Sequence, residues 1–214
     1  AIGKGVMPSY PFFILSIVST YEASTKPIDN EISSQGYCYQ ALLIFFLTKQ
    51  KVSSDDIDSY LNFLSQFAYY LYKEKKHEVT EDEFEDFFKK YCDEYTFCFE
   101  KNVFLRNLVS AQILKKSLGF YSFSYLYLYY FFAGKFFAEE SDSDFKDAVE
   151  NIANNLHTDE NAYIAIFIAH HTKKGYLLEK LKNVCNGLFN KNNPATLEKK
   201  DLDFFDKQIK NIFQ

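Results

Sequence analysis

The sequence of 214 residues has few of the residues that turn a chain: it contains 7 glycines and 4 prolines. An all-β fold needs many tight turns, which Gly and Pro most often supply, so this scarcity favours helices joined by short connections. Tryptophan is absent, although aromatic residues make up 19 % of the chain. We therefore expect a core built largely from Phe and Tyr, and the 47 % of apolar residues suffice for a full one.

Cysteine is also scarce. The four cysteines, Cys38, Cys92, Cys98 and Cys185, form no CxxC pair and no zinc-ligand pattern. We therefore expect free, mostly buried thiols in a reducing compartment, and a cytoplasmic protein. The opening residues lack the order of charged, apolar and small residues that a signal peptide has. Because the chain does not begin with Met, we expect a piece of a longer polypeptide.

Catalytic motifs are missing as well: the sequence contains no GxSxG, no HExxH and no P-loop. His170 and His171 are adjacent, whereas two metal ligands on one helix face need a spacing of three or four, so both are expected at capping or surface positions. We expect no catalytic residue, no metal site and no cofactor bound by this chain by itself. A net charge of −5 also disfavours nucleic acid and anionic membrane surfaces as partners.

Aromatic residues are concentrated in residues 120–140, FYSFSYLYLYYFFAGKFFAEE. A membrane span is disfavoured because tyrosine hydroxyls interrupt the stretch, Lys135 lies within it, and Glu139 and Glu140 end it. Up to residue 125 the pattern has the two-residue period of a strand, and from Leu126 apolar residues recur at helical spacing. We predict a short strand that runs directly into a buried helix.

The rest of the sequence is predominantly helical in pattern. We predict helices over 9–23, 37–49, 55–75, 81–93, 100–110, 126–139, 143–156, 159–171, 175–189 and 197–212, and a β-hairpin over 111–125. Thr80 and Glu83 predict a capping box at the start of the helix over 81–93. Three helices, a hairpin and a further helix make a winged-helix arrangement. The expected fold is mainly α, in three parts: a helical segment over 1–52, a winged-helix subdomain over 53–140 and a helical, sensor-like bundle over 141–214.

Two stretches carry a family resemblance. Residues 121–134, YSFSYLYLYYFFAG, resemble the end of the winged-helix domain of STAND-type ATPases of the NACHT kind, in which a wing strand enters a helix with the pattern F-x-F-x-H-x-x-F-Q-E-F-F-A-A. Residues 7–22, MPSYPFFILSIVSTYE, resemble the helical segment that follows the nucleotide-binding core of that family. With the sensor-like helices near 158–181, the resemblance covers most of the chain and is nearest to bacterial members, many of which act in antiphage defence.

The resemblance implies residues close to a nucleotide. The family's histidine, which contacts the phosphates of bound ADP, falls on Tyr125, and its glutamate falls on Tyr130. A tyrosine hydroxyl can donate a hydrogen bond but carries no charge near neutral pH. The proline that packs near adenine corresponds to Pro8 or Pro11. Because Walker A and Walker B are both absent, this chain is not expected to hydrolyse nucleotide, and ATP or ADP is implied only for a longer protein.

The function that the resemblance implies is that of a regulatory region in a STAND-type signalling ATPase, which closes over bound nucleotide and couples partner sensing to activation. Its implied partners are an upstream ATPase domain in the same polypeptide, further copies of the chain on activation, and a protein trigger. The alternative is a self-contained helical module that binds a protein or peptide in a groove between residues 141 and 214, without nucleotide. A third hypothesis, a winged-helix DNA binder, depends on four cations: Lys101, Arg106, Lys115 and Lys116.

Overall fold

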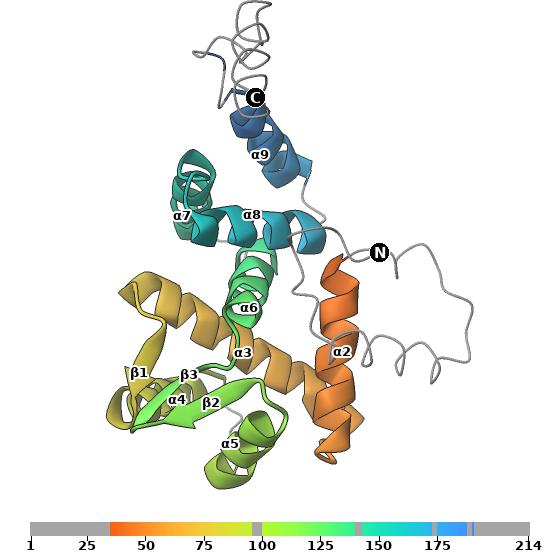
Figure 1. Cartoon of the computed structure of the whole chain (residues 1–214), viewed down its shortest axis with the longest axis vertical. Helices are drawn as coiled ribbons and strands as arrows, with labels where there is room; N and C mark the ends of the chain where they lie inside the picture. Colours follow the sequence, from red (N-terminus) through yellow and green to blue (C-terminus); the bar gives the residue numbers. More distant parts are fainter. Residues whose placement is uncertain (1–34, 96–99, 140–142, 173–174, 188–189, 191–214) are drawn as a thin grey trace, which may run out of the picture.

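Figure 1 shows the computed structural model, which describes residues 35–95, 100–139, 143–172, 175–187 and 190. This part of the chain forms eight helices and three strands: α2 Gln35–Lys49, α3 Ser54–Glu74, β1 Glu78–Thr80, α4 Glu81–Tyr95, α5 Lys101–Ser110, β2 Leu114–Ser117, β3 Phe120–Phe123, α6 Leu126–Glu139, α7 Ser143–Asn154, α8 Asp159–His171 and α9 Gly175–Gly187. The prediction of a mainly helical chain is confirmed. The helices predicted over 9–23 and 197–212 lie outside the described residues.

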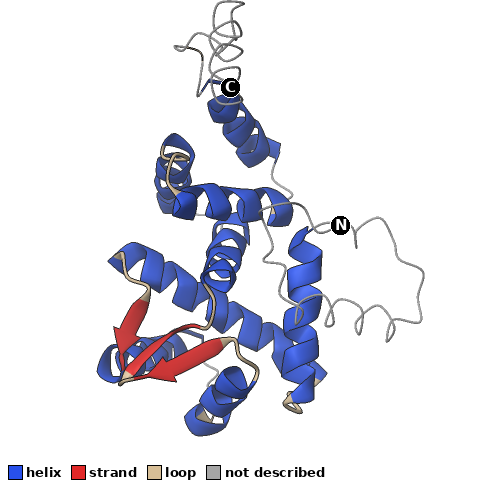
Figure 2. Ribbon diagram, viewed as in Figure 1, coloured by secondary structure: helices blue, strands red, loops and turns tan. Residues whose placement is uncertain are grey.

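The three strands form one small antiparallel sheet in the order β1-β3-β2 (Figure 2). The predicted hairpin is present as β2 and β3, with Ser117 opposite Phe120. Strand β1 was not predicted, because its three residues are too few to show an alternating pattern. Val79, at its centre, is fully buried and pairs with Tyr121. Strand β1 therefore joins the sheet by pairing with a segment about forty residues away in the sequence. The local sequence pattern does not reveal such a pairing.

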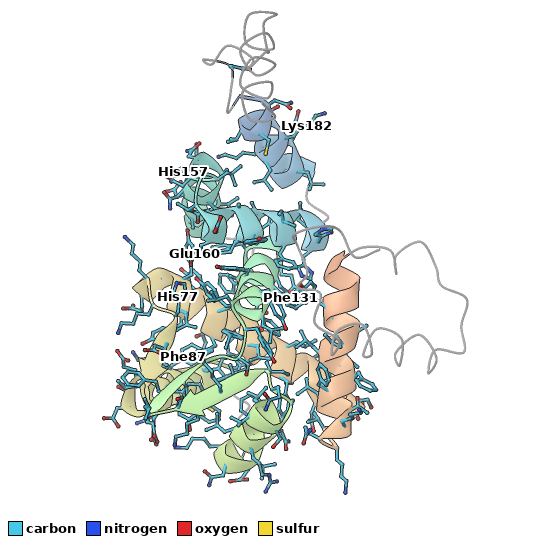
Figure 3. The ribbon with its side chains drawn as sticks, in the orientation of Figure 1. His77, Phe87, Phe131, His157, Glu160 and Lys182 are labelled. Atoms are coloured by element: carbon cyan, nitrogen blue, oxygen red, sulfur yellow. The ribbon has the colours of Figure 1, made fainter. Side chains whose placement is uncertain are left out.

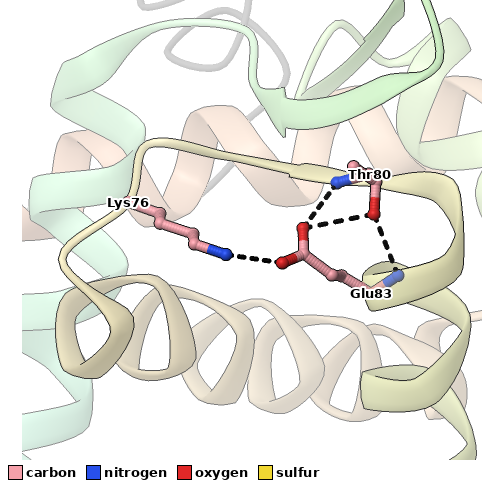
Figure 4. A network of polar contacts seen from close by, with 3 residues as sticks. All are labelled: Lys76, Thr80 and Glu83. Carbon is pink, nitrogen blue, oxygen red and sulfur yellow. Dashed lines mark hydrogen bonds and ion pairs between the residues drawn. The ribbon is translucent and has the colours of Figure 1, made fainter.

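The predicted capping box at the start of α4 is present (Figure 4). The amide of Thr80 donates to Glu83 Oε2 at 2.9 Å, and the amide of Glu83 donates to Thr80 Oγ1 at 3.2 Å. Lys76 forms an ion pair with the other carboxylate oxygen of Glu83. The pKa of the Glu83 carboxyl is lowered by the hydrogen bond from Lys76 and by the amide of Thr80. These contacts fix the entry from β1 into α4.

Three of the described helices are followed by a residue other than glycine in the left-handed backbone conformation. Lys51, Lys75 and Gln112 follow α2, α3 and α5 with φ values of 62°, 54° and 56°, in the left-handed region. The residue after each of them donates its amide across the last turn; for α3, Lys76 N–H bonds to Leu71 O at 3.0 Å. This is the Schellman arrangement, which usually has Gly at the left-handed position. The low glycine content of the chain therefore leaves strained residues at helix ends.

The core is aromatic, as the composition predicted. Helix α3 crosses the molecule and packs against α6, with the rings of Tyr69 and Phe136 stacked at 4.1 Å and 7°. Phe63 and Phe67 of α3 are fully buried and meet aromatic rings of α4, α5 and β3. One continuous cluster of buried residues extends from α2 to Leu181 of α9. Figure 1 shows α6 between the sheet at one end of the molecule and helices α7 to α9 at the other.

The expectation of free thiols is wrong for Cys92, which is disulfide-bonded to a partner that is not among the described side chains. It is correct for Cys185, which is free and exposed. Within the described part of the chain, no helix is both long enough and apolar enough to cross a bilayer. The boundaries proposed for the three parts of the chain stay a prediction.

Candidate functional site

Tyr125 lies where the resemblance predicted, at the junction between a strand and a helix. It follows β3 and immediately precedes α6, and its carbonyl accepts a hydrogen bond from the amide of Leu128 at 3.0 Å. The preceding residue, Ser124, donates its amide to Ile113 O at 2.9 Å, which fixes the junction against the start of the hairpin. The ring of Tyr125 stacks on that of Tyr127 at 5.3 Å and 15°. The backbone at Tyr125 is thus held from both sides, while the residue keeps 36 % of its surface exposed.

Beside Tyr125 lies a small apolar cavity of about 10 Å³, between α2, the α5–β2 turn and the first turn of α6. The described residues that line it are Leu42, Leu43, Phe46, Ala111, Gln112, Ile113, Tyr125, Tyr127 and Leu128. A volume of 10–15 Å³ is about what one water molecule needs. The cavity is therefore too small for a nucleotide. A nucleotide that reached Tyr125 would have to approach the exposed side of the ring.

Helix α6 is joined to α8 along most of its length. At the start of α8, Tyr129 Oη donates to Glu160 Oε1 at 2.6 Å. Burial, together with the hydrogen bond to the negatively charged Glu160, raises the pKa of the Tyr129 hydroxyl, so this group stays protonated. One residue further along α6, the ring of Tyr130 stacks on Tyr163 at 5.4 Å and 11°. Figure 3 labels Glu160 on α8 near the crossing of the two helices.

In the middle of this joint the two backbones approach closely at Gly134. A Cβ built on Gly134 would lie 2.4 Å from Cβ of Phe167, and 3.0 Å from the backbone nitrogen of Ile168. A Cβ essentially never makes a non-bonded contact this short, so α6 accepts only glycine here in the present packing. The fully buried rings of Phe131 and Phe167 meet edge to face beside it, with centroids 5.6 Å apart. Gly134 therefore sets the distance between α6 and α8.

The end of the joint contains an unsatisfied histidine. The ring of His171, the last residue of α8, meets Phe131 at 4.8 Å, and its buried Nε2 has no hydrogen-bond partner among the described residues. Burial, the positive charge of Lys135 and that of His170 lower the pKa of His171 to about 4. The side chain of Lys135 is itself only 13 % exposed and forms an ion pair with Glu139. His171 is therefore neutral at pH 7. It is half-buried at the end of α8, whereas His170 is exposed.

Of the predicted nucleotide-proximal residues, the structure describes Tyr125 alone. Pro8 and Pro11 lie outside the described residues. Tyr130, at the position of the family's glutamate, packs against Tyr163 of α8, whereas Tyr125 packs against Tyr127. Among the described residues, no group of three His, Cys, Asp or Glu side chains could hold a metal ion.

Residues 77–133 match the family model Novel STAND NTPase 4. The chain contains a STAND NTPase-related region. The match begins just before β1 and ends within α6, so it includes the whole sheet, α4, α5 and Tyr125. No curated protein matches this chain.

The α6–α8 joint extends beyond this STAND NTPase-related region and was not predicted. Of its members, Glu160 and Phe167 lie on α8, outside the matched residues, while Tyr129 lies inside them. The sequence shows only Thr158 before a helix and Glu160 in the first turn of that helix. This pattern is common at helix starts and does not indicate a contact with another helix. A contact between two helices is not visible from either helix separately.

Proposed function

We propose that the described helices and sheet form the regulatory part of a STAND-type signalling NTPase, in which α3 to α6 and the sheet are a winged helix that closes over nucleotide held by another domain. The observation that carries the proposal is the α6–α8 joint: α6 begins next to Tyr125 and is fixed to α8 at Glu160, Tyr163 and Phe167. Any displacement of α8 must therefore move the start of α6. The match of residues 77–133 to a STAND NTPase family supports the kind of protein.

The mechanism is a shift between two populations. In the closed state Tyr125 faces the bound nucleotide and its hydroxyl donates to a phosphate oxygen. A protein trigger binds the C-terminal helices better in the open state, and only this difference in affinity can move the equilibrium. Because α8 and α6 move together, binding at the C-terminal helices withdraws Tyr125 from the nucleotide. The open state then exposes the surfaces through which copies associate, and a defence role against phage is one setting for such a switch.

Ion pairing on the sheet side supports a role without nucleic acid. Of the four cations that a DNA-binding winged helix would use, Lys101 is paired with Glu85 at 2.9 Å and Lys116 with Glu81 at 2.8 Å. A cation already neutralised by a carboxylate contributes little to phosphate binding, which depends on the release of counterions from the nucleic acid.

The proposal is tested with the native polypeptide and the substitution Tyr125→Phe, which removes the hydroxyl and keeps the ring. We expect weaker binding of ADP, by about tenfold for a lost hydrogen bond to a charged group, and a raised resting activity. The matched control is Tyr70→Phe, because Tyr70 lies on α3, where its ring meets Phe87. Unchanged ADP affinity for Tyr125→Phe would remove Tyr125 from the nucleotide site. A native polypeptide that binds no nucleotide would instead favour the alternative, a helical interaction module.

A further inference from the structure

The turn between β2 and β3 contains a leucine in a backbone conformation that leucine rarely adopts. Ser117 pairs with Phe120, so Leu118 and Gly119 form a two-residue hairpin turn. Both have positive φ, 51° for Leu118 and 82° for Gly119, as in a type I′ turn. Gly, Asn and Asp adopt this backbone readily, whereas the Cβ of a leucine lies too close to the following carbonyl oxygen. Leu118 is therefore strained.

Leu118 is also almost completely exposed, at 95 %, and the neighbouring Phe120 is 38 % exposed. The base of the turn is fixed by polar contacts: Lys116 forms an ion pair with Glu81, whose amide donates to Gly119 O at 3.1 Å. An apolar centre with a polar rim is the usual arrangement of a protein interface. Leu118 thus combines a strained backbone with an exposed apolar side chain. This combination is expected of a residue that serves binding rather than folding.

The size of this apolar tip limits its partner. A stable complex of two separate proteins buries about 800 Å² on each partner, which one leucine and part of a phenylalanine do not approach. A partner tethered in the same polypeptide needs far less surface, because linkage raises the effective concentration. Pairing of β2 with a second copy is disfavoured, since Lys115 and Lys116 of the two edge strands would meet. The family match includes the whole hairpin, and so the tip belongs to the NTPase-related region.

We propose that Leu118 inserts into an apolar pocket of the nucleotide-binding domain in the same polypeptide and holds the closed, nucleotide-bound arrangement. This inference rests on the proposed function, because it requires such a domain. The hairpin then contributes a contact separate from Tyr125: β3 runs from the turn at Gly119 to Phe123, so the tip and the junction lie at opposite ends of this strand. Loss of the tip contact favours the open state without removing any group from the nucleotide.

The test substitutes Leu118→Asn, since Asn suits the left-handed turn and removes the apolar side chain. We expect the thermal midpoint of this chain to rise by about 2–4 °C, because the backbone strain is relieved. In the native polypeptide, loaded with a fluorescent ADP analogue, we expect the release rate to rise about tenfold, the scale of a typical coupling between sites. A residue with only a structural role would not give higher stability together with faster release.

Two control variants separate the effects. Leu118→Met keeps an apolar tip and should leave the release rate unchanged. Lys75→Gly relieves a left-handed residue at the end of α3, far along the chain from the turn, and should raise the midpoint without changing release. Release that is unchanged in Leu118→Asn, from a polypeptide that does bind the ADP analogue, overturns the inference and leaves the proposed function standing. A polypeptide that binds no ADP overturns both. If Leu118→Asn releases the ADP analogue faster than the unmodified polypeptide only at high protein concentration, the tip contacts a second copy of the chain. That result overturns the proposed partner.

Discussion

Replacement of Gly134 by alanine should loosen the joint between α6 and α8. The added Cβ would lie 2.4 Å from Phe167 Cβ and 3.0 Å from the backbone of both Phe167 and Ile168. None of these atoms is the far end of a flexible side chain, so the two helices must separate by several tenths of an ångström or more. Overpacking of this kind costs about 1–3 kcal/mol, and the better helix propensity of alanine returns about 0.5–1 kcal/mol.

We therefore expect the free energy of unfolding to fall by about 1 kcal/mol, and by at most about 2.5 kcal/mol, which lowers the thermal midpoint by about 2–10 °C for a chain of this size. Denaturant titration measures the first quantity, and hydrogen exchange of the α8 amides locates the change. Gly175→Ala and Gly187→Ala are the controls, because a Cβ at either position meets nothing within 4 Å. Both should change stability by less than about 0.5 kcal/mol. If Gly134→Ala is as stable as these controls, the close approach of the two helices is wrong.

Three further outcomes are expected. His171 has a pKa of about 4 in the folded chain against 6.5 unfolded, so stability is present above pH 6.5 and lost as the pH falls towards 4; we expect a loss of about 2 kcal/mol between pH 7 and pH 5 in urea titrations. His171→Phe should abolish that loss, and an equal loss in this variant would contradict the assignment. Lys75→Gly should stabilise by about 0.5–1 kcal/mol and Lys75→Ala should not, since alanine keeps the left-handed strain; equal gains would refute the backbone explanation. A double-mutant cycle of Tyr129→Phe and Glu160→Gln should give a coupling of about 1–2 kcal/mol, whereas additive losses would mean that their hydrogen bond contributes nothing.

The helices could be predicted from sequence because their signals are local. Periodicity and caps such as Thr80 and Glu83 act within a few residues, and the structure begins α4 where the capping box predicted. The change of period near Tyr125 likewise located the strand-to-helix junction correctly. Strand β1 was not predicted because it is defined by its pairing with a distant strand and not by its own residues. Val79 is a strand residue because it pairs with Tyr121 of β3. Helix α2 begins at Gln35, two residues before its predicted start, a difference within the usual fraying of helix ends.

The candidate site was predictable only in part, for a physical reason. Tyr125 could be found because it occupies a motif position in a continuous stretch. The α6–α8 joint depends on the distance between two helices. The only sign of a short distance in the sequence is a small residue such as Gly134. The two adjacent histidines were expected at capping or surface positions. The packing of α8 on α6 half-buries His171, the last residue of α8, while His170 stays exposed. Composition cannot distinguish the two, because burial there is decided by the helix face that α6 covers.

Glycine usage connects the joint with the hairpin tip. This chain tolerates Lys75 and Gln112 in left-handed positions at helix ends, where a long polar side chain stays in water and the strain is the whole penalty. It keeps glycine at Gly134 and Gly119, where a side chain would meet the backbone of α8 or add strain to a tight turn. Leu118 fits neither case, because its side chain is apolar, exposed and in a strained backbone at the same time. The low glycine content of the sequence explains why the turn has no glycine besides Gly119. It does not explain why position 118 is leucine rather than Asn or Asp. Binding of the leucine side chain by another surface supplies that reason, and it makes the stability and the nucleotide release of Leu118→Asn change in the same upward direction.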